Sequence, residues 1–408
     1  MIRLAIVASH AVQYQAPLFR GLASRLDVTV FFCHRHDPEQ ERQAGYGQAF
    51  SWDVPVLEGY RHTWLDNVAR RPGVNRFSGC DTPDIGRHLR DGRFDACLVH
   101  GWYLKSYLQA IAACRRLGIP VLLRGDSQLT TRRGLVKRAL KYVPYRMLLN
   151  SVDGHLVVGS ANREYLQHYG VPGDRLFDVP HAVDDASFAP LAKQAREQGS
   201  RLRERAALGI PQGARVALFV GRLVASKRPG DLVRALAHPR LPDDVWGLFV
   251  GSGPLDEATR AQAASMNARA VFAGFRNQQA LPACYAAADW LVLPSDSRET
   301  WGLVANEALA CGLPVVVSTG AGCARDMAIP PAGRQYPAGN VDALVAAMTA
   351  VRDDLSRDPA GIEAAVRDLS QAFSRDRAVA AAIRAIESVA ARRAPLPVSD
   401  GAMSGSNH

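Results

Sequence analysis

Short apolar runs rich in Val, Leu and Ile alternate with longer segments of helical periodicity along most of the chain. In the first half these runs predict strands at residues 2–9, 27–33, 95–102, 119–125 and 154–160. Strands that alternate with helices are typical of a parallel sheet wrapped by helices. The first half of the chain is therefore predicted to be a doubly wound α/β domain.

A second series of the same kind follows a polar, charged stretch around residues 185–212. Its predicted strands are residues 215–223, 245–253, 268–275, 289–295 and 313–319. We expect an N-terminal Rossmann-like domain over 1–185, a C-terminal one over 186–372, a helix over 373–395 and a disordered tail over 396–408. In such sheets ligands bind beyond the carboxyl ends of the strands, so the candidate chemistry should follow each run.

The composition narrows the class of protein. The chain has 408 residues, of which 48% are hydrophobic and 22% charged, and no apolar run approaches the ~18 residues that a membrane helix requires. Its first residues resemble a strand more than a signal peptide, so we expect a cytoplasmic protein. The seven cysteines form no Cys-x-x-Cys pair and are expected to be reduced and mostly buried.

The net charge of +10 favours anionic partners such as phosphorylated metabolites, lipid surfaces or nucleic acid. Part of the excess is local, because the segment between Asp126 and Asp153 has basic residues and no acidic ones: Arg132, Arg133, Lys137, Arg138, Lys141 and Arg146. A helix over 132–146 would either dock on an anionic membrane or present an ordinary solvated face. No nucleic-acid-binding module is visible, so a nucleic-acid partner is not predicted.

Two glutamates, Glu299 and Glu307, flank the start of a helix predicted over residues 302–311. Free amides at 302–304 and the helix dipole would favour an anion there. The glutamates either complement that dipole or accept hydrogen bonds from hydroxyl groups, which sugars supply. Arg222 and Lys227 follow a strand of the same domain and would offset the charge of a phosphate.

Two competing motifs are weak. The segment GSGPLD, from residue 251, begins like a dinucleotide fingerprint but lacks the third glycine and lies on a later strand. No Asp-x-Asp occurs in the chain, so the usual signature of a metal-bound diphosphate is missing. We expect neither a catalytic metal nor a cofactor.

The segments FVGRLVASKRP, LFVGSGP, VFAGFR and LPSDSRETWGLVANEALACGLPVV, in this order and spacing, resemble the C-terminal domain of the GT-B glycosyltransferases of the retaining family 4. The resemblance extends over most of the chain through FDACLVHGWYLKSYLQAI, VLLRGDS and VDGHLVVGSANREYLQHYGVPGDRLFDVPHAVDDASF. It implies two Rossmann-like domains facing a central cleft. It also implies transfer of a sugar, with retention of anomeric configuration, from a nucleotide-diphosphate sugar to a glycan or lipid-linked acceptor.

The resemblance also implies roles for individual residues. Arg222 and Lys227 would bind the donor diphosphate without a metal, Glu299 would contact the transferred sugar, and Glu307 would hold the ribose hydroxyls. His100 matches a first-domain histidine that touches the donor sugar. The implied catalytic residues are Glu299, His100, Arg222 and Lys227, and the donor-binding set adds Phe275, Arg276, Thr300, Trp301, Gly302, Leu303, Val304 and Glu307.

The chain departs from the family pattern in the first domain. Family members often have a glycine-rich loop after the first strand, where this chain has residues 9–15, so His10, Gln13 and Tyr14 become candidates for donor or acceptor contacts. Arg124 and Asp126, in VLLRGDS, complete the first-domain candidates. The frequent hinge sequence NGVD is replaced by residues 181–184, and the glutamate common after the Glu pair is missing.

We expect a UDP- or GDP-linked donor and a role in bacterial polysaccharide, lipopolysaccharide or glycolipid synthesis, at the inner face of the membrane. Two rivals remain open. One is a nucleotide-sugar 2-epimerase of the same fold, which would need no acceptor, and the other is a non-catalytic partner that only binds the sugar nucleotide. The contacts that choose sugar, base and acceptor are expected in variable N-terminal loops such as residues 50–78.

Overall fold

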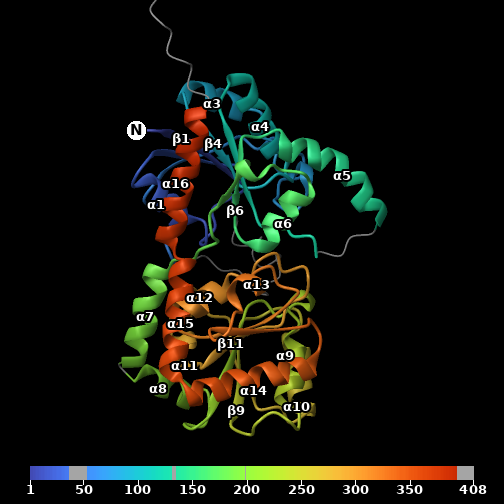
Figure 1. Cartoon of the computed structure of the whole chain (residues 1–408), viewed down its shortest axis with the longest axis vertical. Coiled ribbons are helices and arrows are strands. Elements are labelled where there is room, and N and C mark those ends of the chain that lie inside the picture. The colour runs from blue at the N-terminus through green and yellow to red at the C-terminus, as the bar shows by residue number, and fades with distance from the viewer. Residues whose placement is uncertain (36–52, 131–134, 198, 393–408) are drawn as a thin grey trace, which may run out of the picture.

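The computed structural model describes residues 1–35, 53–130, 135–197 and 199–392. Figure 1 shows two lobes stacked along the long axis, each built around one sheet. The predicted tail over 396–408, together with Arg132 and Arg133 of the basic segment, lies outside the described residues.

The first sheet has seven strands in the order β3-β2-β1-β4-β5-β6-β7, all parallel. The strands are β1 (Arg3–Ala8), β2 (Asp27–Phe32), β3 (Arg61–Trp64), β4 (Ala96–Val99), β5 (Val121–Gly125), β6 (Gly154–Val157) and β7 (Leu176–Asp178). The helices of this lobe are α1 (Ala16–Ala23), α3 (Ile85–Gly92), α4 (Lys105–Leu117), α5 (Leu135–Asn150) and α6 (Ser160–His168).

The second sheet has six strands in the order β10-β9-β8-β11-β12-β13, again all parallel. The strands are β8 (Arg215–Val220), β9 (Val245–Val250), β10 (Ala270–Gly274), β11 (Trp290–Leu293), β12 (Val315–Ser318) and β13 (Gly333–Tyr336). The helices that precede or cover it are α7 (Asp185–Glu197), α8 (Ser200–Ala207), α9 (Pro229–Leu236), α10 (Asp256–Ser265), α11 (Leu281–Ala287), α12 (Val304–Ala310), α13 (Ala324–Met327), α14 (Val341–Arg357) and α15 (Pro359–Ala372).

The predicted fold class, two doubly wound α/β units in tandem, is confirmed. Each strand predicted from an apolar run is present, and the prediction missed three strands that lie at sheet edges: β3, β7 and β13. Their sequences, RHTW, LFD and GRQY, are short and partly polar, because an edge strand is paired on one side only. Such strands lack the continuous apolar run of a buried parallel strand.

The helix predicted over residues 302–311 is shorter than expected, because α12 begins at Val304. Gly302 has φ of 109°, which no helical residue adopts, and a Cβ there would lie 2.5 Å from Cδ2 of Leu293. The glycine is therefore needed for the tight entry into the helix. At the other end Gly312, with φ of 77°, follows the last turn as predicted.

The last helix, α16 (Arg375–Arg392), leaves the second lobe and packs on the first, beside α1 (Figure 1). Its buried face contributes Ala382, Ala385 and Ile386 to the cluster that also contains Leu4 and Ile6 of β1. The chain therefore crosses between the lobes twice, before α7 and before α16.

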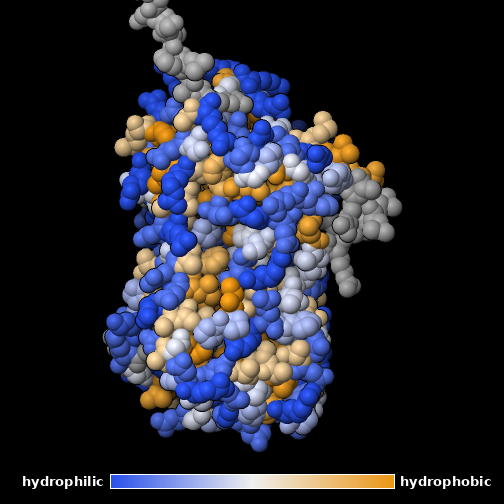
Figure 2. Space-filling view, viewed as in Figure 1, coloured by the Kyte–Doolittle hydropathy of each residue, from blue (hydrophilic) through white to orange (hydrophobic). Residues whose placement is uncertain are grey.

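The cysteines are buried, as the sequence predicts, and most of the surface visible in Figure 2 is hydrophilic. All seven cysteines are buried and none forms a disulfide. Among the described residues no helix is both long and apolar enough to cross a membrane. Figure 2 shows a mainly hydrophilic face, with hydrophobic residues gathered at the outer edge of the first lobe near α5.

The space around two helical glycines, Gly21 at the contact between α1 and α16 and Gly86 in α3, predicts opposite effects of Gly→Ala substitution. A Cβ at Gly21 would lie 2.4 Å from Cγ2 of Val379, a stiff β-branched side chain, so Gly21→Ala should lower the free energy of unfolding by about 1–3 kcal/mol. A Cβ at Gly86, in α3, would lie 3.7 Å from its nearest neighbour, Cβ of Ala113. Gly86→Ala should therefore raise the free energy of unfolding by about 0.5–1 kcal/mol. Urea denaturation of both variants tests the pair, and a stabilised Gly21→Ala protein would contradict the close packing.

Candidate functional site

A cavity of about 820 Å³ lies between the lobes, at the carboxyl ends of the strands of both sheets. His100, predicted to touch the donor sugar, does not line it, whereas every second-domain residue predicted to bind the donor does: Arg222, Lys227, Phe275, Arg276, Glu299, Thr300, Trp301, Gly302, Leu303, Val304 and Glu307. The first lobe contributes Gln13, Tyr14 and Asp126. The sequence had thus selected residues that the fold brings to one place.

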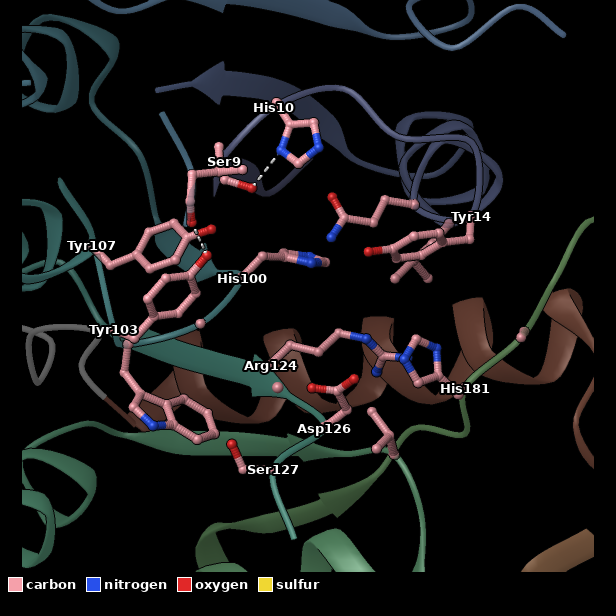
Figure 3. Close-up of a pocket in the computed structure, with 18 of the residues that line it drawn as sticks. Ser9, His10, Tyr14, His100, Tyr103, Tyr107, Arg124, Asp126, Ser127 and His181 are labelled. Carbon is pink, nitrogen blue, oxygen red and sulfur yellow. Dashed lines mark hydrogen bonds between the residues drawn. The ribbon is translucent and has the colours of Figure 1, made fainter. Parts of the chain in front are cut away.

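A second cavity, of about 480 Å³, extends into the first lobe. It is lined by the remaining first-domain candidates, His10, His100 and Arg124, and by both Tyr14 and Asp126 (Figure 3). The two cavities share Tyr14, Asp126, His181, Val183 and Arg375 in their walls. They are therefore adjoining compartments.

Lys227 and Glu299 form an ion pair at the wall of the larger cavity, between Nζ and Oε2. Lys227 ends the short turn η4 (Ala225–Lys227) after β8, and Glu299 follows β11, the neighbour of β8 in the sheet. Ser295 Oγ donates a further hydrogen bond of 3.1 Å to the same carboxylate oxygen. Both side chains are largely buried, so each charge stabilises the other where water is scarce.

Glu307, the second glutamate of the cavity, is more deeply buried than Glu299. Its Oε2 accepts a hydrogen bond of 2.6 Å from the hydroxyl of Tyr285, a fully buried residue of α11. Burial raises the pKa of the Glu307 carboxyl from 4.5 to about 7, although the Tyr285 hydroxyl and Lys227 act in the opposite direction. The side chain is therefore poised between an acceptor and a donor of hydrogen bonds at neutral pH.

This raised pKa predicts how stability depends on pH. Folded Glu307 holds its proton up to about pH 7, whereas the unfolded chain releases it near 4.5. The contribution of Glu307 is thus most favourable below about pH 4.5 and declines by roughly 3 kcal/mol as the pH rises through about 7. Wild type should lose this stability relative to Glu307→Gln in urea denaturation between about pH 5 and about pH 8. Parallel pH profiles for the two proteins would contradict the assignment.

Among the groups that can carry positive charge in the first-domain cavity, His100, Arg124 and His181 lie close together (Figure 3). Burial lowers the pKa of His100 to about 3, with a further contribution from Arg124, and burial with the same arginine lowers the pKa of His181 well below its ordinary value. Arg124 donates to the carbonyl oxygens of Val179 at 3.0 Å and Pro180 at 3.2 Å. Both imidazoles are therefore neutral.

The ring of His100 is positioned by Phe19, with 5.1 Å between ring centroids, and by the bond of its amide to the carbonyl of Val7. Its Nε2 is buried and has no hydrogen-bond partner among the described residues. A buried polar atom without a partner costs free energy, so Nε2 is available for a group that enters the cavity.

The first lobe holds the loop of Glu299 in place through polar contacts across the cleft. Gln128 Nε2 donates to the carbonyl oxygen of Glu299 at 2.7 Å and lies 3.4 Å from that of Ser297 and 3.3 Å from that of Gly320. Thr300 Oγ1 donates a bond of 2.6 Å to Asp126 Oδ2. These bonds fix the Glu299 backbone relative to the first-domain cavity.

A second set of contacts surrounds residues 181–184, which lie between β7 and α7. Asn306 of α12 accepts from Trp301 Nε1 at 2.8 Å and donates to the carbonyl of His181 at 2.8 Å. Close by, Ser160 Oγ of the first lobe donates to Asp326 Oδ1 of the second at 2.5 Å. Both contacts thus link the lobes near Trp301, beside which Gly159 lies.

The sequence prediction missed Gln128, Tyr285 and Asn306. Gln128 follows the carboxyl end of β5, so the rule that ligand-binding residues come after the strands would have found it. Tyr285 contacts Glu307 and Asn306 contacts His181, in each case a residue distant in the sequence. Asn306 lies inside the segment LPSDSRETWGLVANEALACGLPVV, but neither that motif nor any spacing pointed to these contacts.

The contacts of Gln128 predict a clear effect. Gln128→Ala leaves buried carbonyl groups without their donor, so we expect the free energy of unfolding to fall by about 1–3 kcal/mol. Hydrogen exchange in residues 295–302 should also become faster. Gln262→Ala is the matched control, because the Gln262 amide makes only long contacts, of 3.4 Å with the carbonyl oxygen of Gly230 and 3.9 Å with Sδ of Met266, and it should stay within about 0.5 kcal/mol of wild type. Equal effects of both substitutions would show that Gln128 does not hold the loop.

Comparison with known proteins agrees with this geometry. The family model of glycosyl transferases group 1 matches residues 200–365, and that of the glycosyl transferase 4-like domain matches residues 11–182. A protein named D-inositol 3-phosphate glycosyltransferase from Mycolicibacterium vanbaalenii is 35% identical over 79% of this chain and 76% of its own. One of the same name from Acidothermus cellulolyticus is 31% identical over 75% of this chain and 69% of its own. The chain belongs to this family of group 1, family-4-like glycosyltransferases.

The fraction of each relative's length that aligns with this chain differs from one relative to another. A D-inositol 3-phosphate glycosyltransferase from an Arthrobacter species is 31% identical over 57% of this chain, and the match spans 56% of its length.

Solved structures show the same fold at low identity. Anabaena HepE in complex with UDP has a TM-score of 0.72 and 16% identity, over 95% of this chain and 100% of that one. Sucrose-phosphate synthase from Thermosynechococcus elongatus has a TM-score of 0.70 and 20% identity, over 96% of this chain and 100% of that one. These likenesses support the GT-B fold.

Proposed function

We propose that the protein transfers a sugar from a nucleotide-diphosphate sugar in the larger cavity to an acceptor in the first-domain cavity, with retention of anomeric configuration. The observation that carries the proposal is the Lys227–Glu299 ion pair in the wall of a cavity that Arg222 and the start of α12 also line. Cations and amides suit the diphosphate, and carboxylates suit the hydroxyls of sugar and ribose.

The ion pair also suggests how the donor is received. A diphosphate at Arg222 would compete for the Lys227 ammonium and leave the Glu299 carboxylate to accept from a sugar hydroxyl. Glu307 would accept from the ribose in the same way, and Phe275 and Arg276 lie where the base would be held. HepE was solved with UDP and with UDP-glucose, which supports a nucleotide-sugar donor here, most simply a UDP- or GDP-linked one.

The chemistry requires stabilisation of the charge that develops on the leaving diphosphate. Arg222, Lys227 and the amides of residues 302–304 would provide it as fixed electrostatics, without a metal ion. Glu299 would position the sugar without forming a covalent bond, so that the acceptor attacks from the face that the diphosphate leaves. The neutral imidazole of His100, with its buried Nε2, suits a hydrogen bond to the donor sugar.

The acceptor cavity is rich in aromatic side chains, and its walls include Trp102, Tyr103, Tyr107, Tyr145 and Tyr165. Flat rings with polar edges suit a glycan or a lipid-linked sugar, in keeping with bacterial polysaccharide, lipopolysaccharide or glycolipid synthesis on the cytoplasmic side. Because relatives are named for D-inositol 3-phosphate, that compound also belongs in a panel of acceptors.

A donor panel separates this proposal from its rivals. The protein is incubated with UDP-, GDP- and dTDP-sugars, with and without envelope extract or inositol phosphate, and free nucleotide and donor sugar are followed. We expect nucleotide release that depends on acceptor, and a product with the anomeric configuration of the donor. Epimerised donor without release would instead indicate a 2-epimerase, and binding without either reaction a non-catalytic partner.

Substitution of the ion pair gives a sharper test. Glu299→Gln removes the carboxylate that positions the sugar and Lys227→Ala removes a charge from the diphosphate site, so each should lower kcat by roughly a hundredfold or more. Arg298→Ala is the control, because Arg298 is adjacent in sequence but exposed and paired with Asp296, and it should keep a near wild-type rate. Near wild-type turnover in both site variants would refute the assignment of the site.

A further inference from the structure

Helix α5 carries an exposed apolar stripe on its outer face. Leu140 is 72% exposed, Val143 60% and Met147 69%, and Pro144 is exposed between them. The spacing i, i+3, i+4 and i+7 places all four on one face of the helix. Figure 2 shows hydrophobic residues at this edge of the molecule.

The opposite face of α5 is packed, so the helix is held in place with its apolar stripe outward. Leu149 is fully buried, and Tyr142, Tyr145 and Leu148 pack against the same core cluster. Tyr142 stacks on Tyr169 with 5.6 Å between ring centroids. An apolar patch that a well-packed helix keeps exposed is typical of a binding surface.

Positive charge flanks the stripe. Lys141 and Arg146 are exposed on α5, with the Lys141 ammonium 5.6 Å from the ring centroid of Tyr145 and the Arg146 guanidinium 3.4 Å from the carbonyl oxygen of Tyr169. No acidic residue occurs in the sequence between Asp126 and Asp153. A symmetric contact between two copies would bring these like charges together, whereas anionic lipid would complement them.

We propose that α5 docks the protein on an anionic lipid bilayer, with Leu140, Val143 and Met147 entering the headgroup boundary and Lys141 and Arg146 contacting lipid phosphates. Membrane binding would then depend on apolar contacts as well as on charge. The apolar stripe supplies the part of the binding energy that salt does not screen.

The same helix forms part of the acceptor cavity. Tyr145, on its inner face, lines that cavity together with the exposed Tyr103. A docked α5 would therefore hold the cavity beside the bilayer, where a lipid-borne acceptor is found. This last step rests on the proposed function, whereas the docking itself does not.

The test is sedimentation of the full chain with vesicles of phosphatidylcholine, with and without phosphatidylglycerol. Wild type should bind the anionic vesicles, and Leu140→Ser combined with Met147→Ser should weaken that binding roughly tenfold. Lys141→Glu should weaken it by a similar factor, because it reverses one charge near the surface. The control combines Val68→Ser with Leu202→Ser, at residues 62% and 49% exposed elsewhere, and should bind like wild type.

Nucleotide-sugar binding by each variant, measured without vesicles, shows whether the variant is folded and tests the donor site separately. Loss of vesicle binding with intact donor binding supports docking by α5. The proposal is overturned if wild type ignores anionic vesicles, if the stripe variant binds as well as wild type, or if the stripe instead drives self-association that the variant abolishes. Vesicle binding without any glycosyl transfer would leave α5 supported and would count against the proposed function alone.

Discussion

The Lys227–Glu299 ion pair is the contact around which the rest of the site is arranged. It joins the loops after β8 and β11, which are neighbours in the second sheet, at the edge that faces the first lobe. Neither charge would be stable alone in so enclosed a wall, so the pair fixes both loops together. Gln128 then attaches the first lobe to the carbonyl oxygen of Glu299 itself, and Asp126 attaches it to the neighbouring Thr300.

The electrostatics differ between the two compartments. In the larger cavity cations and a carboxylate are in contact, which suits a ligand with both phosphates and hydroxyls. In the first-domain cavity Arg124, Asp126 and Arg375 carry fixed charges, and Arg124 helps to keep His100 and His181 neutral. Burial itself lowers the pKa of Arg124 to about 10, and Asp126 opposes that shift. Charge is thus concentrated where a leaving diphosphate would need it.

The sequence predicted the parts of this structure that depend on local pattern. Apolar runs gave the central strands, and the residues after them, such as Arg222 and Glu299, do gather at one edge. It failed where contacts between residues distant in the sequence decide the outcome, as for edge strand β13 and for the pairing of Lys227 with Glu299. Gln128 was overlooked although it follows β5, where ligand-binding residues are expected. The start of α12 was misplaced because Gly302 is needed for a turn that only its packing on Leu293 reveals. The basic segment was read for its charge, whereas the outward stripe of α5 requires the packed position of the helix.

In the proposed function, the ion pair and the start of α12 determine where the charges of a bound donor would lie. A crystal structure of the protein with a non-hydrolysable nucleotide-sugar tests it most directly. The account predicts the diphosphate against Arg222 and Lys227 at the start of α12, the Glu299 carboxylate on a sugar hydroxyl, and Glu307 on the ribose. A diphosphate held away from Lys227, or a sugar that does not contact Glu299, would contradict it.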